Sequence, residues 1–333
     1  MGTYLGDPTP EVDASYIFSA VEALRRGINL LDTSINYRHQ RSERNLGEAL
    51  RQLFATAELT RDEVAVCTKA GYLAFDQEMP ADPRAYLTRE YIASGIIDPS
   101  ELAGGMHCIA PRFLANQLER SRANLGLETI DVFYLHNPET QLSSTPFETF
   151  RRRLLDAFTA LEHAVDEGKI RYYGTATWNG YRVAPGQPGY LSLEDVEAIA
   201  REAAGERHHF RFVQLPFSLG MPEAYGFHNQ SLKGEPMSLL EAANRLGVAV
   251  VGSATLHQGA LSEGLPEFIQ QRLGFPHDAQ NAIQFARSAP GLATALVGMS
   301  RVSHVEMNVA VATRPPTPLK EWRKLFQQER QTA

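Results

Sequence analysis

Short apolar segments alternate with amphipathic segments along almost the whole chain, and this alternation limits the fold more than any other feature of the sequence. The apolar segments are expected strands, at residues 2–5, 29–32, 64–68, 131–135, 171–175, 212–214, 249–252 and 295–297. The amphipathic segments have helical periodicity, at residues 15–26, 43–53, 111–125, 147–167, 193–204, 237–246, 281–288 and 302–312. Eight strand–helix pairs in strict alternation predict an α/β fold, a (β/α)₈ TIM barrel, in preference to two doubly wound domains.

Three further segments extend this prediction. Residues 71–110 follow the third strand and residues 216–236 follow the sixth, and both are too long to be simple connections. Barrel enzymes place substrate-shaping loops after strand C-termini, so we expect that role for both loops. Residues 318–328 are expected to form an extra C-terminal helix outside the barrel. No linker rich in Pro, Gly or Ser divides the series, so residues 1–333 are expected to form a single domain.

Charge and cysteine content argue against several classes of protein. A formal net charge of −7 gives no general reason to expect a nucleic-acid or membrane-surface partner. Cys67 and Cys108 are too few for a disulfide framework, and with the histidines they show no zinc spacing, so no metal site is expected. No apolar run approaches the ~20 residues that span a bilayer, and no charged-then-apolar leader opens the sequence. We therefore expect a soluble cytoplasmic protein.

Four chemically complementary side chains lie at or just beyond consecutive expected strands. Asp32 ends the second strand and Tyr37 follows it, Lys69 ends the third strand, and His136 ends the fourth. In a barrel, the C-terminal ends of the strands meet at one pocket. An ammonium group beside a phenol lowers the phenol pKa from its usual value of about 10, and a carboxylate keeps a buried lysine charged. With a neutral imidazole, these groups could polarise a carbonyl and deliver a proton to its oxygen.

Each of these residues also has a purely structural interpretation. An aspartate at a strand end often caps the next helix, a tyrosine in a loop often packs there, and a histidine is often a hydrogen-bonded core residue. A lysine directly after a buried strand is less usual, because its charge needs a partner. The occurrence of all four on consecutive strands favours a catalytic function.

The sequence resembles the aldo-keto reductase family over nearly its full length. The resemblance is carried by GINLLDTSINY with SERNLGEAL, then VCTKAG, LGLETIDVFYLHNP and EGKIRYYGTATW. It implies the barrel fold and a catalytic tetrad of Asp32, Tyr37, Lys69 and His136, with Tyr37 as the general acid. It also implies a nicotinamide cofactor, NADP (NADPH) in preference to NAD, bound without a glycine-rich Rossmann turn. The sequence contains no G-x-G-x-x-G, in agreement with this implication.

The resemblance also identifies candidate cofactor contacts, with some departures from the family pattern. Thr3 belongs to a Gly–Thr pair that often lies near the cofactor. Where the family usually has Ser–Asn to hold the carboxamide, this chain has Ala176 and Thr177, so Thr177 and Asn179 are the candidates here. Gln214 resembles the family's glutamine, and Phe217 resembles the aromatic residue that stacks on the nicotinamide. A core position is the alternative for Phe217, but the Q-x-x-aromatic spacing at a strand end favours stacking.

The remaining candidates lie after the last two expected strands. The run from Gly252 to Gly259 departs from the family's tyrosine–serine–proline–leucine run, so only backbone amides, Leu256 and Gln258 are expected near the pyrophosphate. The segment VGMSRVSHVEMNVA resembles the loop and helix start that bind the 2′-phosphate and adenine. It contributes the candidates Ser300, Arg301, His304 and Asn308.

These observations predict an oxidoreductase that reduces an aldehyde or ketone to an alcohol, with a small-molecule substrate. Two alternatives stay open: a cofactor-binding regulatory or sensor protein of the same fold with little turnover, and a barrel lyase that uses Lys69 as a Schiff base. The sequence does not define the substrate or the oligomeric state.

Overall fold

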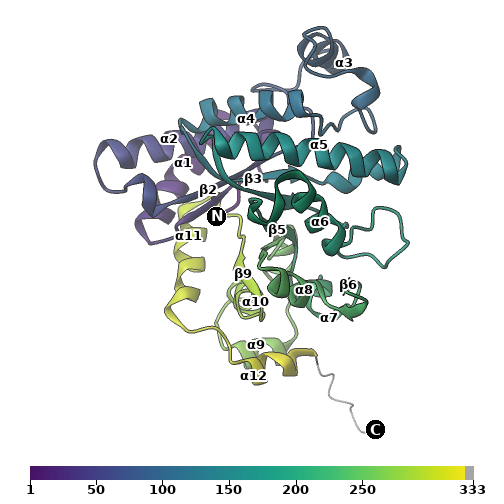
Figure 1. Cartoon of the computed structure of the whole chain (residues 1–333). Coiled ribbons are helices and arrows are strands. Elements are labelled where there is room, and N and C mark those ends of the chain that lie inside the picture. Colours follow the sequence, from purple (N-terminus) through teal and green to yellow (C-terminus); the bar gives the residue numbers. More distant parts are fainter. Residues whose placement is uncertain (327–333) are drawn as a thin grey trace.

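The computed structural model describes residues 1–326, and its centre is a curled sheet of parallel strands (Figure 1). Seven strands are hydrogen-bonded in the order β1-β2-β3-β4-β5-β8-β9. Their bounds are β1 Leu30–Asp32, β2 Ala65–Ala70, β3 Ile130–His136, β4 Ile170–Ala176, β5 Phe210–Pro216, β8 Ala249–Ser253 and β9 Leu292–Ala295. A separate antiparallel pair, β6 Gln230–Leu232 and β7 Glu235–Met237, lies in the long connection after β5.

The two edges of this sheet meet at a single residue near the N-terminus. Gly2 forms parallel bridges to both Asp32 and Gly298, and its amide donates to the carbonyl of Val297 at 2.9 Å. The prediction of a full strand at residues 2–5 is therefore wrong, because pairing stops after Gly2. Side chains replace a strand partner there, since the Thr3 carbonyl accepts from Ser42 and the Leu5 carbonyl accepts from the Tyr16 hydroxyl.

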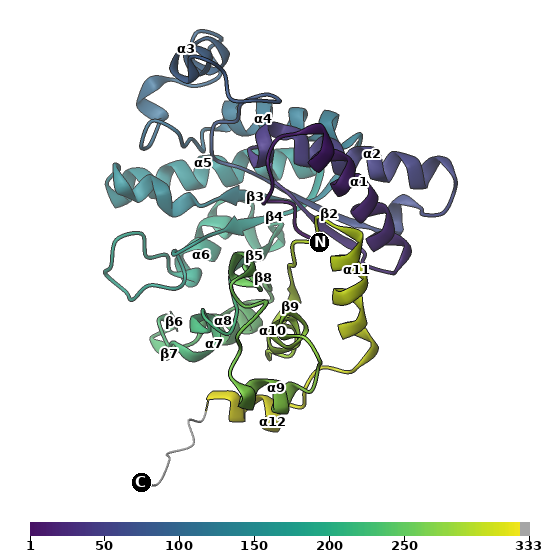
Figure 2. The ribbon, with the colours of Figure 1, turned by 180° about the vertical axis from the view of Figure 1, so that it is seen from behind.

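Helices surround the sheet, as Figures 1 and 2 show from opposite sides. Neighbouring helices pack in a ring that runs α1-α2-α4-α5-α6-α8, and α11 packs against both α10 and α1. The long helices are α1 Pro10–Arg25, α2 Arg41–Ala55, α4 Pro111–Leu125, α5 Phe147–Asp166, α6 Leu193–Ala204, α8 Leu239–Leu246, α10 Asp278–Arg287 and α11 Val302–Val309. Shorter helices are α3 Pro83–Leu87, α7 Glu223–Gly226, α9 Glu267–Leu273 and α12 Leu319–Arg323. The curled parallel sheet with helices outside it is that of an α/β barrel.

The segments that connect or follow these elements have structure of their own. Residues 71–110 contain α3 and project beyond the barrel (Figure 1), whereas residues 216–236 contain α7 and the β6–β7 pair. Residues 319–323 form α12, and Trp322 packs against Phe285 with its indole N–H on the Phe285 carbonyl. The last two residues of the helix predicted at 318–328 lie outside the described residues. Within residues 1–326, no helix is both long and apolar enough to cross a membrane.

The core has two parts, and the smaller one positions the functional site. The larger part lies between sheet and helices, and it includes Leu31, Val66 and Phe133. The smaller part lies inside the barrel and consists of Cys67, Val132, Tyr134 and Ala176, with Leu30 and Phe212 packed against it. Since side chains alternate across a strand, residues two positions further along point to the same interior.

Candidate active site

The interior face of the barrel brings four polar residues together above the small inner core. Asp32, Lys69, His136 and Gln214 lie two positions after Leu30, Cys67, Tyr134 and Phe212 respectively, so each continues the inward face of its own strand. The register between β2 and β3 pairs Lys69 with Tyr134, two residues before His136 and on the same inward face of β3. The predicted convergence of Asp32, Lys69 and His136 therefore follows from strand parity and register.

Asp32 and Lys69 form a buried ion pair with 2.5 Å between Oδ1 and Nζ. The same ammonium donates to the Thr33 carbonyl at 2.7 Å, and Gln214 Nε2 donates to Asp32 Oδ2 at 2.7 Å. Burial alone would lower the pKa of Lys69, but the Asp32 and Tyr37 charges together raise it above its usual value. A lysine held protonated is a poor amine nucleophile, which argues against the Schiff-base alternative.

Tyr37 is placed beside this pair by an unusual turn. Arg38, His39 and Gln40 have φ values of 48°, 55° and 70°, in the left-handed region that side chains rarely adopt. The turn is held by polar contacts of its own side chains: Arg38 pairs with Asp13 at 2.8 Å, and Gln40 donates to the Phe75 carbonyl at 3.0 Å.

The Tyr37 ring lies over the ammonium, with Lys69 Nζ 5.1 Å from its centroid. Burial raises the pKa of Tyr37 above its usual value, and Lys69 acts in the opposite direction. The prediction of a net lowering is thus wrong for the protein alone, although the effect of Lys69 has the expected sign. A phenol with a raised pKa is protonated at neutral pH and can serve as a proton donor.

His136 is held from several directions. Its Nδ1 lies 3.2 Å from Ser34 Oγ, and its ring packs edge-on against Tyr37 and Tyr72. His107, from the segment after β2, contacts the His136 carbonyl through Nε2 at 2.7 Å. Burial, together with Lys69 and His107, lowers the pKa of His136 well below its usual value, so the imidazole is neutral.

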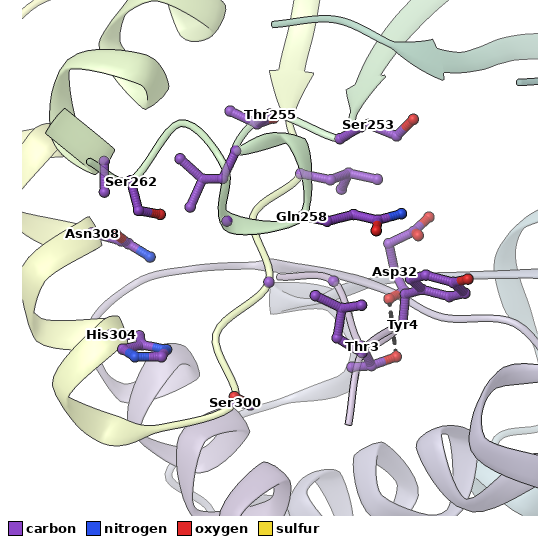
Figure 3. A pocket seen from close by; sticks show the side chains of 18 of the residues that line it. Thr3, Tyr4, Asp32, Ser253, Thr255, Gln258, Ser262, Ser300, His304 and Asn308 are labelled. Carbon is purple, nitrogen blue, oxygen red and sulfur yellow. Dashed lines mark hydrogen bonds between the residues drawn. The ribbon is translucent and has the colours of Figure 1, made fainter. Parts of the chain in front are cut away.

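These groups form one end of a cavity of about 1160 Å³. Figure 3 shows Thr3, Tyr4 and Asp32 at this end, and His304 and Asn308 of α11 at the other, facing the loop that carries Ser262. We call the end at Tyr37 and His136 the proposed catalytic end. The cavity lining also includes Tyr4, Leu5, Asn36, Tyr72, Asn137 and Trp178. Of the aromatic residues in the two long loops, Tyr72 lines the cavity, while Tyr225 packs on Trp322.

Most of the predicted cofactor residues line this cavity, and three do not. Those that do are Thr3, Thr177, Gln214, Leu256, Gln258, Ser300, His304 and Asn308. Phe217 is fully buried and its ring stacks on Phe285 at 5.7 Å, so the prediction that it stacks on a cofactor is wrong and the core interpretation holds. Asn179 is exposed outside the cavity and is held through its backbone, with its amide on Glu139 and its carbonyl accepting from the amides of Arg182 and Val183. Arg301 is exposed at the start of α11 and likewise does not line the cavity.

The cavity walls have free hydrogen-bonding capacity that suits a polar extended ligand. Thr177 and Thr255 line the cavity, and their buried hydroxyl groups have no hydrogen-bond partner within residues 1–326. Thr177 sits at the end of a loop fixed by Glu139, whose Oε1 accepts the amides of Trp178, Asn179 and Gly180 at 2.8, 3.1 and 3.3 Å. Since a buried hydroxyl without a partner is costly, these threonines fit donors or acceptors of a bound nicotinamide cofactor.

Four residues that support the site were not predicted from the sequence: Ser34, Gly71, His107 and Glu139. Gly71 packs so tightly that a Cβ there would lie 2.5 Å from the His136 carbonyl oxygen and 2.8 Å from His107 Nε2. Of these four, only Ser34 could have been suggested by the sequence, because it lies between the candidate residues Asp32 and Tyr37. No cluster of three or more potential metal ligands occurs in the described part of the chain.

Comparison with known proteins agrees with this geometry. Residues 1–272 match the model of the Aldo/keto reductase family. The L-glyceraldehyde 3-phosphate reductase of Escherichia coli strain K12 is 29% identical over 252 residues, 74% of this chain but only 55% of the relative's length. The L-galactose dehydrogenase of Arabidopsis thaliana is 24% identical, with 94% of this chain and 82% of that protein covered.

Solved structures share the fold. An aldo/keto reductase from Klebsiella pneumoniae, in complex with NADP and acetate, has a TM-score of 0.64 at 20% identity, covering 98% of this chain and 88% of that one. The holo form of an aldo-keto reductase from Bacillus halodurans has a TM-score of 0.65 at 18% identity, covering 98% and 90%. The match over residues 1–272, on a barrel with these four residues at one end of its cavity, shows that the chain belongs to the aldo/keto reductase family.

Proposed function

We propose that this protein is an NADP(H)-dependent carbonyl reductase in which Tyr37 is the general acid. The observation that carries the proposal is the cluster of a buried Asp32–Lys69 ion pair, a phenol over the ammonium and a neutral imidazole, all at one end of a large cavity. The Klebsiella pneumoniae structure, which was solved in complex with NADP, supports the choice of cofactor.

Each residue of the cluster has a distinct role in this proposal. Tyr37 donates its phenolic proton to the oxygen of the reacting carbonyl, and Lys69 stabilises the phenolate that is left. Asp32 keeps Lys69 protonated and fixed in place, and Gln214 orients the second Asp32 oxygen. His136 contacts the carbonyl oxygen through its ring and fixes its direction.

The other end of the cavity would hold the cofactor, which supplies the hydride when bound. Thr177 and Gln214 would contact the carboxamide, and Thr255, Leu256 and Gln258 would lie along the pyrophosphate. Ser300, His304 and Asn308 would contact the adenosine end, where His277 and His304 are the basic side chains of the lining.

The substrate proposed for the catalytic end is a small uncharged carbonyl compound. Among the residues of the described chain that line the cavity there is no lysine or arginine, and Lys69 beneath it is already paired. Tyr4 and Trp178 are 58% and 43% exposed, and Asn36 and Asn137 add amide groups. Flat aromatic faces and neutral amides suit a hydroxylated aldehyde better than a phosphorylated one.

The test compares Tyr37→Phe with Tyr4→Phe, because both phenols line the cavity and their rings are 5.1 Å apart. Carbonyl-dependent oxidation of NADPH should be lost in Y37F and retained in Y4F, while both variants bind NADPH as the wild type does. Unchanged turnover in Y37F would refute the role of Tyr37. Cofactor binding without turnover of any aldehyde by the wild type would favour a sensor protein instead.

A further inference from the structure

The hydroxyl group of Ser34 lies at the centre of three polar contacts behind the catalytic end of the cavity. Ser34 Oγ is 2.6 Å from Asn36 Oδ1, 3.1 Å from the Lys69 carbonyl oxygen and 3.2 Å from His136 Nδ1. Ser34 is fully buried, so water does not compete for these contacts. Its single proton can occupy only one of the three at a time.

The position of that proton determines the tautomer of His136. The His136 ring is neutral and therefore carries one proton, on either Nδ1 or Nε2. If Ser34 donates to Asn36, then His136 must carry its proton on Nδ1 and donate it to Ser34. If Ser34 donates to His136, the proton of the ring must be on Nε2. Within residues 1–326, no polar partner of His136 Nδ1 other than Ser34 is seen, so the choice is made at this contact.

The two tautomers present opposite chemistry to a ligand. Nε2 with a proton can donate to a carbonyl oxygen, whereas Nε2 without one can only accept, as from an alcohol O–H. The contact from Ser34 to Asn36 Oδ1 is the shortest of the three, so with the Asn36 oxygen turned toward Ser34 we expect the Nδ1–H tautomer in the free protein. Donation to a carbonyl then requires the Asn36 amide to turn, so that its NH₂ group donates to Ser34 and Ser34 donates to His136 Nδ1. In the same change the ring gives up its Nδ1 proton and takes one up on Nε2 by exchange with solvent.

We infer that Ser34 is a positioning residue that sets the tautomer of His136, and that Asn36 directs Ser34. Asn36 itself lines the cavity, so a bound substrate can contact the amide that controls which group Ser34 donates to. His107 serves a different purpose, because it contacts the His136 backbone carbonyl and not the ring nitrogen. The inference rests on the proposed function for its catalytic consequence, but the tautomer is a property of the protein that needs no turnover to be observed.

The direct test is nitrogen-15 NMR of the histidine rings in the free protein, which distinguishes the two tautomers. The wild type should show His136 with its proton on Nδ1. Ser34→Ala removes the acceptor of that proton, so His136 should shift to Nε2–H. Asn36→Asp supplies a carboxylate that only accepts, and His136 should stay Nδ1–H. The double variant S34A/N36D should match S34A, because Asn36 acts through Ser34.

The control variant is Ser19→Ala, which removes another buried serine hydroxyl, one without a partner in the described chain. It should leave the His136 signals unchanged.

Kinetics supply a second readout. In N36D, Ser34 donates to the carboxylate of residue 36, so His136 keeps its proton on Nδ1 and its Nε2 can only accept. We therefore expect kcat/KM for carbonyl reduction to fall about 100-fold, the usual effect of losing one donor to a developing oxyanion. Adding S34A to N36D should recover at least about tenfold of this loss, since the block passes through Ser34. An unchanged His136 tautomer in S34A, or a double variant that behaves as N36D does, would overturn the inference. The tautomer shifts remain measurable if Y37F shows that Tyr37 is not the acid, so the two proposals can fail separately.

Discussion

The ammonium of Lys69 lies 2.5 Å from Asp32 Oδ1, in a pair whose side chains are only 1% and 5% exposed. Taking two charges out of water is costly, so neither partner can be removed without leaving the other uncompensated. The pair is therefore both a support of the fold at the strand ends and the proposed source of the positive charge beneath Tyr37.

Removal of both charges should destabilise the protein by less than the sum of the two single removals. We expect Asp32→Asn and Lys69→Met each to lower the free energy of unfolding by about 3 kcal/mol, because each leaves one buried charge unpaired. The double variant should lose clearly less than the sum. Urea unfolding of the four proteins measures this coupling, and strictly additive losses would contradict it.

Stability should decrease in mild acid through His107. Burial lowers the pKa of His107 to about 4, against its usual value near 6.5. Between these values the unfolded chain binds a proton that the folded protein does not, so stability is complete above pH 6.5 and is lost as the pH falls toward 4. The contribution is about 3.5 kcal/mol, the product of the pKa difference and about 1.4 kcal/mol per unit.

The control for this prediction is His107→Gln, which keeps an amide donor but does not titrate in this range. Its free energy of unfolding should fall less steeply between pH 6.5 and 4 than that of the wild type. Equal slopes in urea titrations across this range would show that His107 is not the group responsible.

Loss of the Glu139 carboxylate should release the loop that carries Thr177. Glu139→Ala leaves three backbone amides without their acceptor, and we expect a loss of about 2–3 kcal/mol in unfolding free energy. Affinity for NADPH should weaken about tenfold, because Thr177 is then less well placed. Glu139→Gln keeps an acceptor oxygen and should show smaller effects on both measurements. Equal effects of the two variants would mean that the amide contacts are not the cause.

A methyl group at Gly71 should disturb His136. The Cβ of Gly71→Ala would meet the His136 carbonyl and His107 at distances well below normal contact, at an expected cost of about 1–3 kcal/mol. We expect kcat to fall with it. Gly226→Ala is the matched control, since a Cβ there meets nothing within 4 Å and should leave both quantities unchanged. Retained activity and stability in G71A would show that this packing does not position His136.

The charge of the substrate should decide which aldehydes react. Glyceraldehyde should have a kcat/KM at least about tenfold higher than glyceraldehyde 3-phosphate, because no free cation lines the described catalytic end to pair with a phosphate. Steady-state assays with both compounds at several ionic strengths measure the difference. A preference for the phosphorylated compound would reject the proposed substrate class.

The sequence by itself determined the strand–helix order and the residues that face the barrel interior. Asp32, Lys69 and His136 could be placed at one pocket because side-chain parity along a strand and the common direction of parallel strands are local and regular properties. The same pattern placed Tyr37 in the loop after the second expected strand, and the family motifs added Thr177 and the loop after β8. The boundaries of α4 and α6 were also predicted correctly, at residues 111–125 and 193–204.

Only the tertiary structure decided which side chains complete the site. Phe217 directly follows β5, which carries Gln214, yet it stacks on Phe285 in the core, and Arg301 does not line the cavity that Ser300 lines. Ser34, His107 and Glu139 act through contacts that span 29 to 102 residues of sequence. No local pattern encodes such contacts, because they depend on how loops from different strands pack against one another.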